Sequence, residues 1–392
     1  MRNPKMRFRT LQDEHYSDYE SRALKDVCTI KREIIDISKQ GNSKFLEYSM
    51  PAFDAGCLPN PILGMDAKSG RIPIYGDVLL FNKLNVRKKR IWNIHNCPKN
   101  SICSAEFMPI VTTEVLQDYM YYLVSTEKFT KILEECSSGT SNSQKRITPS
   151  VFLGQILNFP CYEEQQKIAA FFTALDEKIN IEKSRLKNLK NLYNLAVSKA
   201  FDESKAENVP LSKVASFHSG LTYKPTDVAS NGTIVLRSTN IQNNHLELYD
   251  KVFVSLNIHE KLKCRVGDIL MCVRNGSRRL VGKTALIDQS AKDCTWGAFM
   301  MIIRSIEDNH WVHHYFRSDN FRLQINNDSN TATINQITKG MLNDCLIPWP
   351  VEENRRLFSE LLDLIEKRIT VSEEKIEQLN RLKKAFMQQM FV

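Results

Sequence analysis

Two stretches of the sequence repeat one pattern, and this repeat decides the fold. The first, residues 160–201, reads PCYEEQQKIAAFFTALDEKINIEKSRLKNLKNLYNLAVSKAF, and the second, residues 350–391, reads PVEENRRLFSELLDLIEKRITVSEEKIEQLNRLKKAFMQQMF. They align without a gap at an offset of 190 residues, and upstream of them Ile147-Thr148 aligns with Ile337-Thr338. This period is far too long for a solenoid repeat, so we expect a duplicated domain in which each copy ends in this segment.

Both stretches predict a long α-helix. Each follows a proline, contains no further Pro or Gly, and places apolar residues at alternating steps of three and four. The apolar stripe is too narrow to cover a globular core, and it suits pairing with another long helix. The predicted pairing residues are Ile168, Phe172, Leu175, Ile179, Leu186 and Leu189 in the first helix and Phe358, Leu362, Ile365, Ile369, Ile376 and Leu379 in the second.

We expect each helix to pair with the other copy, in an antiparallel coiled coil with pseudo-two-fold symmetry. The alternative is that each helix packs only on its own globular unit. The stripe is broken at Glu182 in the first helix and at Ser372 and Lys383 in the second. Because Glu182 and Ser372 occupy matching positions, the sequence predicts a polar contact or a local loosening there.

The regions before the helices predict an α+β fold with two tandem globular domains of mixed helix and strand. We expect domain 1 at residues 1–160, helix 1 at 161–201, domain 2 at 202–350 and helix 2 at 351–392. In domain 2, short β-branched runs between turn signals predict strands, and Trp311 to Asn326 predicts one amphipathic helix. Domain 1 echoes this order: residues 76–80 match residues 267–271, Phe107-Met108 matches Phe299-Met300, and residues 115–132 supply the helix.

Composition limits the function. A chain of 392 residues can hold two good cores besides the helices, and its formal charge of +9 favours a polyanionic partner. No run approaches the 18 or more apolar residues of a membrane span, and the N-terminus is charged, so we expect a cytoplasmic protein without a membrane partner. The ten cysteines form no C-x-x-C pair, which argues against a structural zinc site and for reduced thiols.

Basic and amide side chains cluster at the same point of both copies, just after the echoed strand. Lys and Arg neutralise DNA phosphates, and Arg and Asn can bond guanine and adenine edges. A solvated, charged turn is the alternative, but recurrence in both copies favours DNA binding. The first cluster comprises Lys83, Asn85, Arg87, Lys88, Lys89 and Arg90; the second comprises Arg274, Asn275, Ser277, Arg278, Arg279 and Lys283; and a third surface comprises Thr222, Tyr223, Lys224, Arg237, Ser238, Thr239 and Asn240.

The sequence offers no catalytic motif, and we expect a protein without catalysis of its own. The segment from Gly276 to Gly282-Lys283-Thr284 has five residues between its glycines where a phosphate-binding loop needs four. His310, His313 and His314 have metal-like spacing, but no cysteine or carboxylate cluster joins them, so we expect no metal. A nucleotide hydrolase built on residues 276–284 remains an alternative that ATP turnover would test.

The helix segment Glu164-Gln-Gln-Lys-Ile-Ala169, followed by Leu175-Asp176 and the leucine run to Phe201, resembles the conserved helix of specificity subunits of type I restriction-modification enzymes. The opening of domain 2, from Phe217 to Thr222, is also typical of a target-recognition domain in that family. The resemblance implies two recognition domains in inverted orientation, each reading half of a bipartite, asymmetric site in double-stranded DNA, with the helices setting the spacer. It also implies two modification (methyltransferase) subunits and restriction subunits as partners, with S-adenosylmethionine, ATP and Mg on them and no cofactor on this chain.

The sequence departs from the family pattern in two places. Helix 2 has residues 353–356 as Glu-Asn-Arg-Arg where helix 1 has Glu-Glu-Gln-Gln, and domain 1 opens without the glycine turn of domain 2. Two alternatives stay open: a related system whose partner fuses methylation and cleavage, and a coiled-coil scaffold that binds no DNA. Sequence-selective, salt-sensitive DNA binding would separate a DNA reader from a scaffold.

Overall fold

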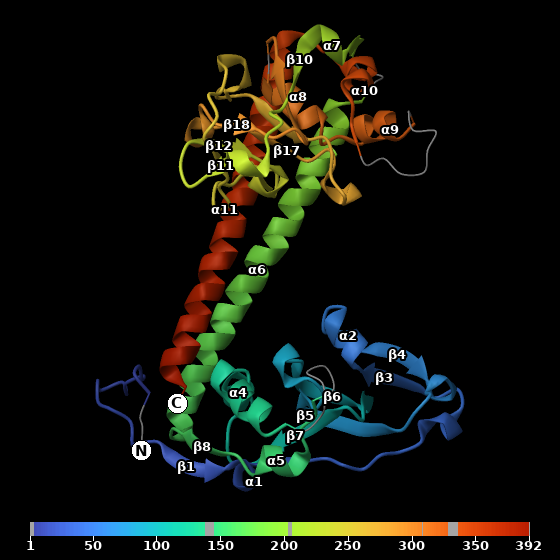
Figure 1. Cartoon of the computed structure of the whole chain (residues 1–392). Coiled ribbons are helices and arrows are strands. Elements are labelled where there is room, and N and C mark those ends of the chain that lie inside the picture. Colours follow the sequence, from blue (N-terminus) through green and yellow to red (C-terminus); the bar gives the residue numbers. More distant parts are fainter. Residues whose placement is uncertain (1–3, 138–144, 203–205, 308, 328–335, 392) are drawn as a thin grey trace. The chain divides into compact units, whose positions relative to one another are not determined.

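The computed structural model describes residues 4–137, 145–202, 206–307, 309–327 and 336–391, and these residues form a mixed helix-and-sheet fold, as the α+β prediction requires (Figure 1). The chain divides into two compact units. Unit 1 comprises Met1–Glu182 and Lys375–Val392, and unit 2 comprises Lys183–Glu374. Each unit therefore contains one globular region and half of each long helix. The predicted ranges 1–160, 202–350 and 351–392 include positions outside the described residues.

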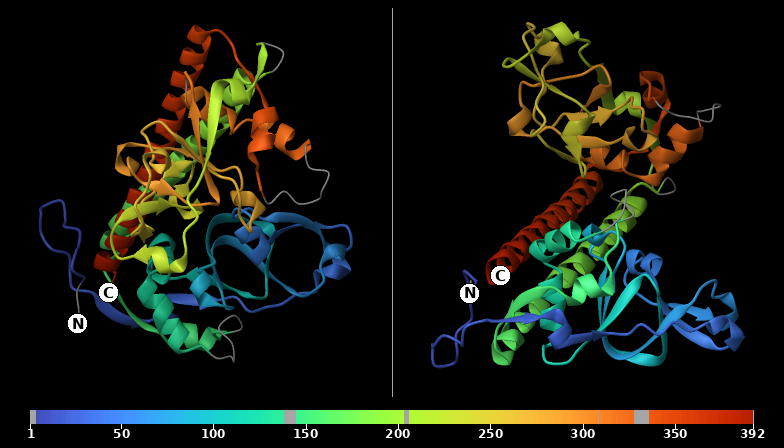
Figure 2. Two further views of the ribbon diagram at one scale, coloured as in Figure 1. Left: turned by 45° about the horizontal axis from the view of Figure 1, so that its top comes forward. Right: turned by 60° about the horizontal axis from the view of Figure 1, so that its bottom comes forward.

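The two repeated segments form the two longest helices, α6 (Tyr162–Ala200) and α11 (Glu352–Met390), each of 39 residues. Figure 2 shows both helices from two further directions. The first turn of each carries two glutamates, whose charge interacts favourably with the positive end of the helix dipole. Proline shortly before each start and an unbroken run of good helix formers explain why the sequence located them closely.

Unit 1 contains a six-stranded sheet in the order β2-β7-β5-β6-β3-β4 and a two-stranded sheet of β1 and β8. The strands are β1 (Glu20–Ala23), β2 (Cys28–Ile30), β3 (Lys44–Tyr48), β4 (Asn60–Leu63), β5 (Arg71–Asn82), β6 (Ile91–Ser104), β7 (Phe107–Thr112) and β8 (Ile156–Phe159). The shorter helices are α1 (Leu24–Val27), α2 (Met50–Asp54), α3 (Gln117–Val124), α4 (Glu127–Glu135) and α5 (Pro149–Leu153). One face of the large sheet and the start of α6 share the main core of this unit.

Unit 2 contains two four-stranded sheets, in the orders β10-β19-β16-β17 and β11-β15-β12-β18, and the two-stranded pairs β13-β14 and β9-β20. The strands are β9 (Asn208–Pro210), β10 (Ala215–Ser219), β11 (Val228–Ala229), β12 (Thr233–Leu236), β13 (Ile241–Gln242), β14 (His245–Leu246), β15 (Phe253–Val254), β16 (Ile269–Cys272), β17 (Thr284–Leu286), β18 (Thr295–Trp296), β19 (Met300–Ser305) and β20 (Leu346–Pro348). The shorter helices are α7 (Leu211–Val214), α8 (Asn309–Tyr315), α9 (Asp319–Asn327) and α10 (Lys339–Asp344).

The topology of unit 1 recurs in unit 2. The antiparallel order β2-β7-β5-β6 matches the antiparallel order β10-β19-β16-β17. The antiparallel pair of β1 with β8 matches the pair of β9 with β20, and a short helix follows β1 and β9 in each case. Each unit thus repeats the same core plan, while the added strands of the two units differ.

The strand echo seen in the sequence is one residue out of register. Leu79 shares a buried cluster with Phe172 of α6, and Ile269 shares one with Leu362 of α11, whereas Leu270 lies in a separate cluster. Successive strand residues face opposite sides of a sheet, so Leu79 corresponds to Ile269 and not to Leu270. The irregular pairing of β5 at Gly76, where φ is +68°, explains why the glycines suggested the wrong alignment.

The same correction applies to the aromatic residue of the echo. Phe107 pairs with Asn82, and Met300 pairs with Cys272, so Phe107 corresponds to Met300. Phe107 and Met300 are both 1% exposed, while Phe299 is 58% exposed. The exposed Phe299 is therefore a feature of unit 2 that has no equivalent at the matching position of unit 1.

Each of the two predicted amphipathic helices is two helices. The Thr126 hydroxyl accepts a hydrogen bond from the Phe129 N–H at 3.2 Å and begins α4, and the Ser318 hydroxyl accepts one from the Phe321 N–H at 3.1 Å and begins α9. These side chains satisfy a free N–H at the new helix start. The prediction of one continuous helix was wrong in both copies, because apolar periodicity continues across the break while the capping residue interrupts the backbone.

In unit 1, the first half of α6 lies along the last half of α11. Ile168 and Phe172 are fully buried, Leu175 and Ile179 form a buried cluster with Leu379, and Ile376 is half-buried. The breaks in the stripe carry polar contacts: Glu182 pairs with Lys375, and Lys383 bonds Asp176 at 2.5 and 2.7 Å. Rising numbers in α6 meet falling numbers in α11, so these halves pair antiparallel.

In unit 2, the last half of α6 lies along the first half of α11. Leu362, Ile365 and Ile369 are buried, while Leu186, Leu189 and Phe358 are partly buried against the same cluster. Lys190 of α6 pairs with Glu373 of α11 at 2.7 Å. The cluster also contains Trp311 and residues of the sheet, so both helices pack on the globular region as well as on each other.

Candidate nucleic-acid interface

The first basic cluster lies at the end of β5 in unit 1, and most of its charge is neutralised within the unit. Arg87 pairs with Glu134, Lys89 lies 2.9 Å from Glu127, and Arg90 bonds both oxygens of Asp54, at 2.8 and 2.5 Å. The Arg90 hydrogen bonds hold the pKa of the Asp54 carboxyl below its usual value, and Lys89 lowers the pKa of Glu127.

Only part of this cluster therefore suits an external anion. Lys88 is exposed and has no ion pair with a described residue, and Lys83 is half-buried. Asn85 has a left-handed backbone, with φ of +53°, and its N–H donates to the Lys145 carbonyl at 2.9 Å. Every cation of this run was predicted to bind DNA, because the carboxylates that pair with three of them lie far away in the chain.

In unit 2, the structure brings the second cluster and the third surface together. The Asn275 amide donates to the Ser238 hydroxyl at 3.2 Å, and the Arg274 guanidinium lies over the Phe299 ring at 5.4 Å from its centre. Ser277 follows Asn275 and donates its N–H to the Asn275 side chain at 2.9 Å. Sequence reasoning placed these two groups separately, because nothing local links residues 238 and 275.

A cavity of about 600 Å³ opens beside this contact, and we call it the Phe299 cavity. Its described lining includes Thr222, Tyr223, Arg237, Ser238, Thr239 and Phe299. Apolar walls with a few hydroxyl and cationic groups at the edge suit the methyl group and the polar edges of a base. Sequence reasoning placed Phe299 only in the strand echo, because its exposure and its contact with Arg274 arise from the fold.

Close backbone approach builds one wall of the Phe299 cavity. Leu221 donates its N–H to the Trp296 carbonyl at 2.7 Å, and Gly297 donates to the Leu236 carbonyl at 3.0 Å. A Cβ atom on Gly220 would lie 2.0 Å from the Gly297 carbonyl oxygen, so this crossing requires glycine. The glycine in the Phe217–Thr222 segment therefore has a packing role beside the candidate interface.

Three members of the third surface are committed to the fold to different degrees. Asn240 is fully buried, and its side chain bonds the Arg237 N–H at 2.9 Å and the Glu247 carbonyl at 2.8 Å. Asn240 therefore supports the fold of this surface, and reaching a base would break these bonds. Arg237 pairs with Asp250 at 2.7 Å and remains at the cavity. Lys224 is exposed, and its N–H donates to Asp227 at 2.7 Å.

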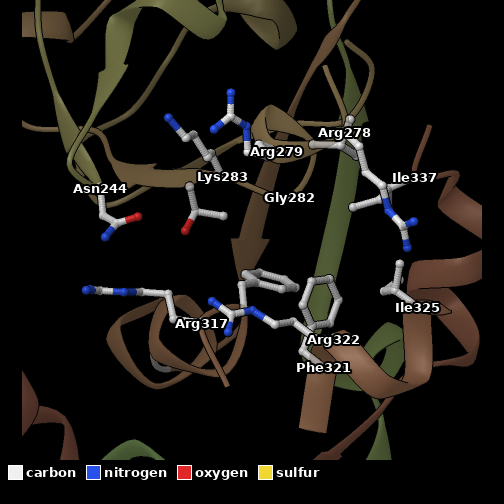
Figure 3. A pocket seen from close by; sticks show the side chains of 13 residues that line it. Asn244, Arg278, Arg279, Gly282, Lys283, Arg317, Phe321, Arg322, Ile325 and Ile337 are labelled. Atoms are coloured by element: carbon white, nitrogen blue, oxygen red, sulfur yellow. The ribbon is translucent and has the colours of Figure 1, made fainter. Parts of the chain in front are cut away.

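The remaining basic residues of the second cluster lie away from the Phe299 cavity. Arg278, Arg279 and Lys283 line a separate pocket with residues of α9, shown in Figure 3. Gly282 and Lys283 lead into strand β17, whereas a phosphate-binding loop of nucleotide hydrolases opens a helix. The local fold thus contradicts the alternative of such a loop at residues 276–284.

His313, His314 and Glu366 come together in unit 2, with possible ligand atoms within 4.8 Å of one another. Both nitrogens of His314 are already used, by the Tyr193 hydroxyl at 2.8 Å and by Asp363 at 2.9 Å. Glu366 pairs with Arg317. Burial lowers the pKa of His313 well below its usual value. His314 and Glu366 thus belong to a core polar network, whereas both ring nitrogens of His313 are buried and have no hydrogen-bond partner among the described residues.

Among the described residues, none of the helices combines the length and apolar character needed to cross a bilayer.

Part of the chain is similar to known proteins. Residues 16–191 match the model of the family described as type I restriction modification DNA specificity domain. The StySPI specificity subunit of Salmonella potsdam is 29% identical over 187 residues, and the EcoKI specificity subunit of Escherichia coli K12 is 28% identical over 186 residues. Each match spans 46% of this chain and 40% of the relative's length.

Solved structures share the fold along nearly the whole chain. The specificity subunit of a type I system from M. genitalium gives a TM-score of 0.62 at 12% identity and covers 100% of this chain and 99% of its own. A chain from a study of type I complex assembly and conformational transition gives 0.60 at 20% identity, covering 96% and 98%. At these identities the likeness concerns the fold. Residues 16–191 are thus similar to the type I restriction modification DNA specificity domain, and the likeness of the whole chain to the solved structures is one of fold.

Proposed function

We propose that this chain is the DNA sequence-specificity subunit of a type I restriction-modification complex. Each unit reads one half of a bipartite, asymmetric site in double-stranded DNA through its globular region. The long helices form one antiparallel coiled coil with pseudo-two-fold symmetry, and this coil sets the spacer between the half-sites. The chain itself carries out no catalysis.

The duplicated core with diverged surfaces is the observation that carries this proposal. The strand order β2-β7-β5-β6 recurs as β10-β19-β16-β17, so both units present the same framework. The surfaces built on it differ: Arg87, Lys89 and Arg90 of unit 1 are paired with carboxylates, while unit 2 exposes Phe299 beside Arg274 and Asn275. Two equal frameworks with unequal surfaces suit the reading of two unequal half-sites.

Partners supply the chemistry in this proposal. Two modification subunits bind the helices and globular regions and hold S-adenosylmethionine for adenine methylation, and restriction subunits hold ATP and Mg for translocation and cleavage. Exposed apolar residues along α11, among them Leu357, Leu361 and Leu364, support a helix face that other subunits cover.

The test is to co-express this chain with candidate modification subunits in a host without DNA methylation and to map N6-methyladenine over the genome. We expect a bipartite motif that appears only when this chain is present. A stable complex that creates no motif would contradict sequence-directed methylation. Failure of every complex, together with DNA binding that ignores sequence, would favour the scaffold alternative.

A further inference from the structure

A basic pocket lies in unit 2 between the loop before β17 and the α8–α9 junction (Figure 3). We call it the Arg279 pocket. It has a volume of about 300 Å³, and residues from four separate segments line it. Its cationic side chains are Arg278, Arg279, Lys283, Arg317 and Arg322, and no carboxylate is among its described lining residues. Cations gathered from separate segments without acids create a positive potential that favours an anion.

Internal ion pairs account for only part of this charge. Arg317 pairs with Glu366 and stacks over Tyr193 at 4.2 Å, so it belongs to the core. Arg322 lies 3.2 Å from Asp319 in a pair whose two side chains are largely exposed, and such pairs are weak. Arg279 and Lys283 form no ion pair with any described residue, and Arg279 is exposed. At least two charges at the pocket are thus available to an external anion.

The two units differ in the ion pairs that this loop makes with the helix beside it. In unit 1, Glu127 and Glu134 of α4 pair with Lys89 and Arg87 of the matching loop. Helix α9 is the counterpart of α4, since Phe129 and Phe321 occupy the same position, one in each core. At the same alignment, Glu127 corresponds to Asp319, which pairs with Arg322 of its own helix, and Glu134 corresponds to Asn326. In unit 2, Arg279 and Lys283 therefore form no ion pair with a described residue of α9.

A buried hydroxyl provides an independent indication. Thr284 lines the Arg279 pocket, is 1% exposed, and its hydroxyl has no hydrogen-bond partner among the described residues. Buried hydroxyls are nearly always bonded, and an unpaired one is unfavourable. Asn244 adds an amide at the edge. Phosphate oxygens would accept hydrogen bonds from the hydroxyl, the amide and the guanidinium groups together.

We propose that the Arg279 pocket binds a phosphate group, and that in the complex with DNA this group belongs to the DNA backbone. The assignment of this phosphate group to DNA rests on the proposed function, whereas phosphate binding by the pocket does not. The basic run of unit 2 is then divided by role. Arg274 and Asn275, at the Phe299 cavity, contact bases, while Arg278, Arg279 and Lys283 hold the backbone.

The first arm of the test measures DNA binding by the full chain over a range of salt concentrations, with duplexes of unrelated sequence. The double variant Arg279→Gln/Lys283→Gln should weaken binding to all duplexes by the same factor. It should also reduce the slope of log affinity against log salt by about 0.9 for one lost phosphate contact. Lys292→Gln, which removes an exposed charge of unit 2 outside the pocket, should leave the slope unchanged.

The second arm titrates inorganic phosphate into the full chain and follows the thermal midpoint. A pocket that takes free phosphate predicts a rise of the midpoint in the natural chain and none in the double variant. A changed slope alone identifies the DNA backbone as the source, and a phosphate-dependent midpoint alone identifies a small phosphate. If the double variant changes neither, the proposal is overturned.

Two controls keep this result separate from folding and from the proposed function. The charge-conserving variant Arg279→Lys/Lys283→Arg should restore the slope, and all variants should melt alike without ligand. If the natural chain binds DNA without any sequence preference, the proposed function fails, while the phosphate titration still decides the pocket.

Discussion

Arg274 and Arg278 lie on the same loop, yet they meet different surroundings. Arg274 lies over Phe299 beside the Phe299 cavity, while Arg278 lines the Arg279 pocket with residues of α9. Side chains of one type on one loop can therefore have different roles, since base contacts specify a sequence and phosphate contacts position the protein.

We expect Arg274→Gln to change recognition of one half-site and to leave the other unchanged. An arginine that reads a base typically contributes about 1–3 kcal/mol of discrimination against the wrong base. The measurement is the methylation motif made with each variant, with Lys292→Gln as the matched control. A uniform loss over all half-site sequences would instead assign Arg274 to the DNA backbone.

His313 predicts a pH dependence of stability. Burial is the main cause that lowers its pKa in the folded chain, and His314, Arg317 and His310 lower it further, while Asp363 opposes them. The unfolded chain takes up a proton near pH 6.5 that the folded chain cannot accept. The free energy of unfolding should therefore fall as the pH drops below about 6.5, by up to about 1.4 kcal/mol per pH unit from this residue.

The check is urea denaturation from pH 7.5 to pH 5 on the natural chain and on His313→Leu, which cannot titrate there. We expect the variant to show the flatter profile below pH 6.5. Equal slopes for the two chains would mean that His313 does not control this dependence.

At the scale of elements, α6 and α11 pair through a few buried apolar residues on their facing stripes. Leu379 is 9% exposed against Leu175 and Ile179, whereas Leu382, three residues along the same helix, is 45% exposed. Both are leucines on one helix, and only tertiary packing distinguishes them. This difference supplies an internal control for the energetic value of the pairing.

Leu379→Ala should lower the free energy of unfolding by about 2–3 kcal/mol, because it removes buried methyl groups and leaves a cavity. Leu382→Ala should change it by less than about 0.5 kcal/mol, since alanine is a good helix former and the position is exposed. The urea midpoints of the two variants give the comparison. Equal effects would contradict the pairing of α11 with α6 at Leu379.

At the scale of the whole molecule, the globular regions would determine the half-site sequences, and the long helices would determine the spacer length. Each unit contains its own sheet and its own half of each helix. We expect the insertion of seven residues, about two helical turns, into both α6 and α11 to lengthen the spacer of the methylation motif and to preserve both half-sites. A changed half-site with an unchanged spacer would contradict a spacer set by the helices.

Much of the architecture followed from the sequence alone. The long helices are periodic features of the sequence, and the structure has them where the pattern predicts them. At the break of the apolar stripe the sequence left a polar contact and a local loosening open, and the structure shows that Glu182 pairs with Lys375. The sequence also predicted short strands in domain 2, and β12, β16 and β17 lie there, whereas two-residue strands such as β13 and β14 were not predicted. The resemblance to the specificity family rests on residues of the same helices.

Only the tertiary structure decided which candidate residues are available. The acids that pair with Arg87, Lys89 and Arg90 are 36 or more residues away in the chain, and so is the Ser238 partner of Asn275. The one-residue shift of the strand echo and the burial of Asn240 likewise depend on packing between distant segments. Charge and periodicity are properties of the sequence, whereas ion pairing, burial and cavities depend on which distant segments the fold places together.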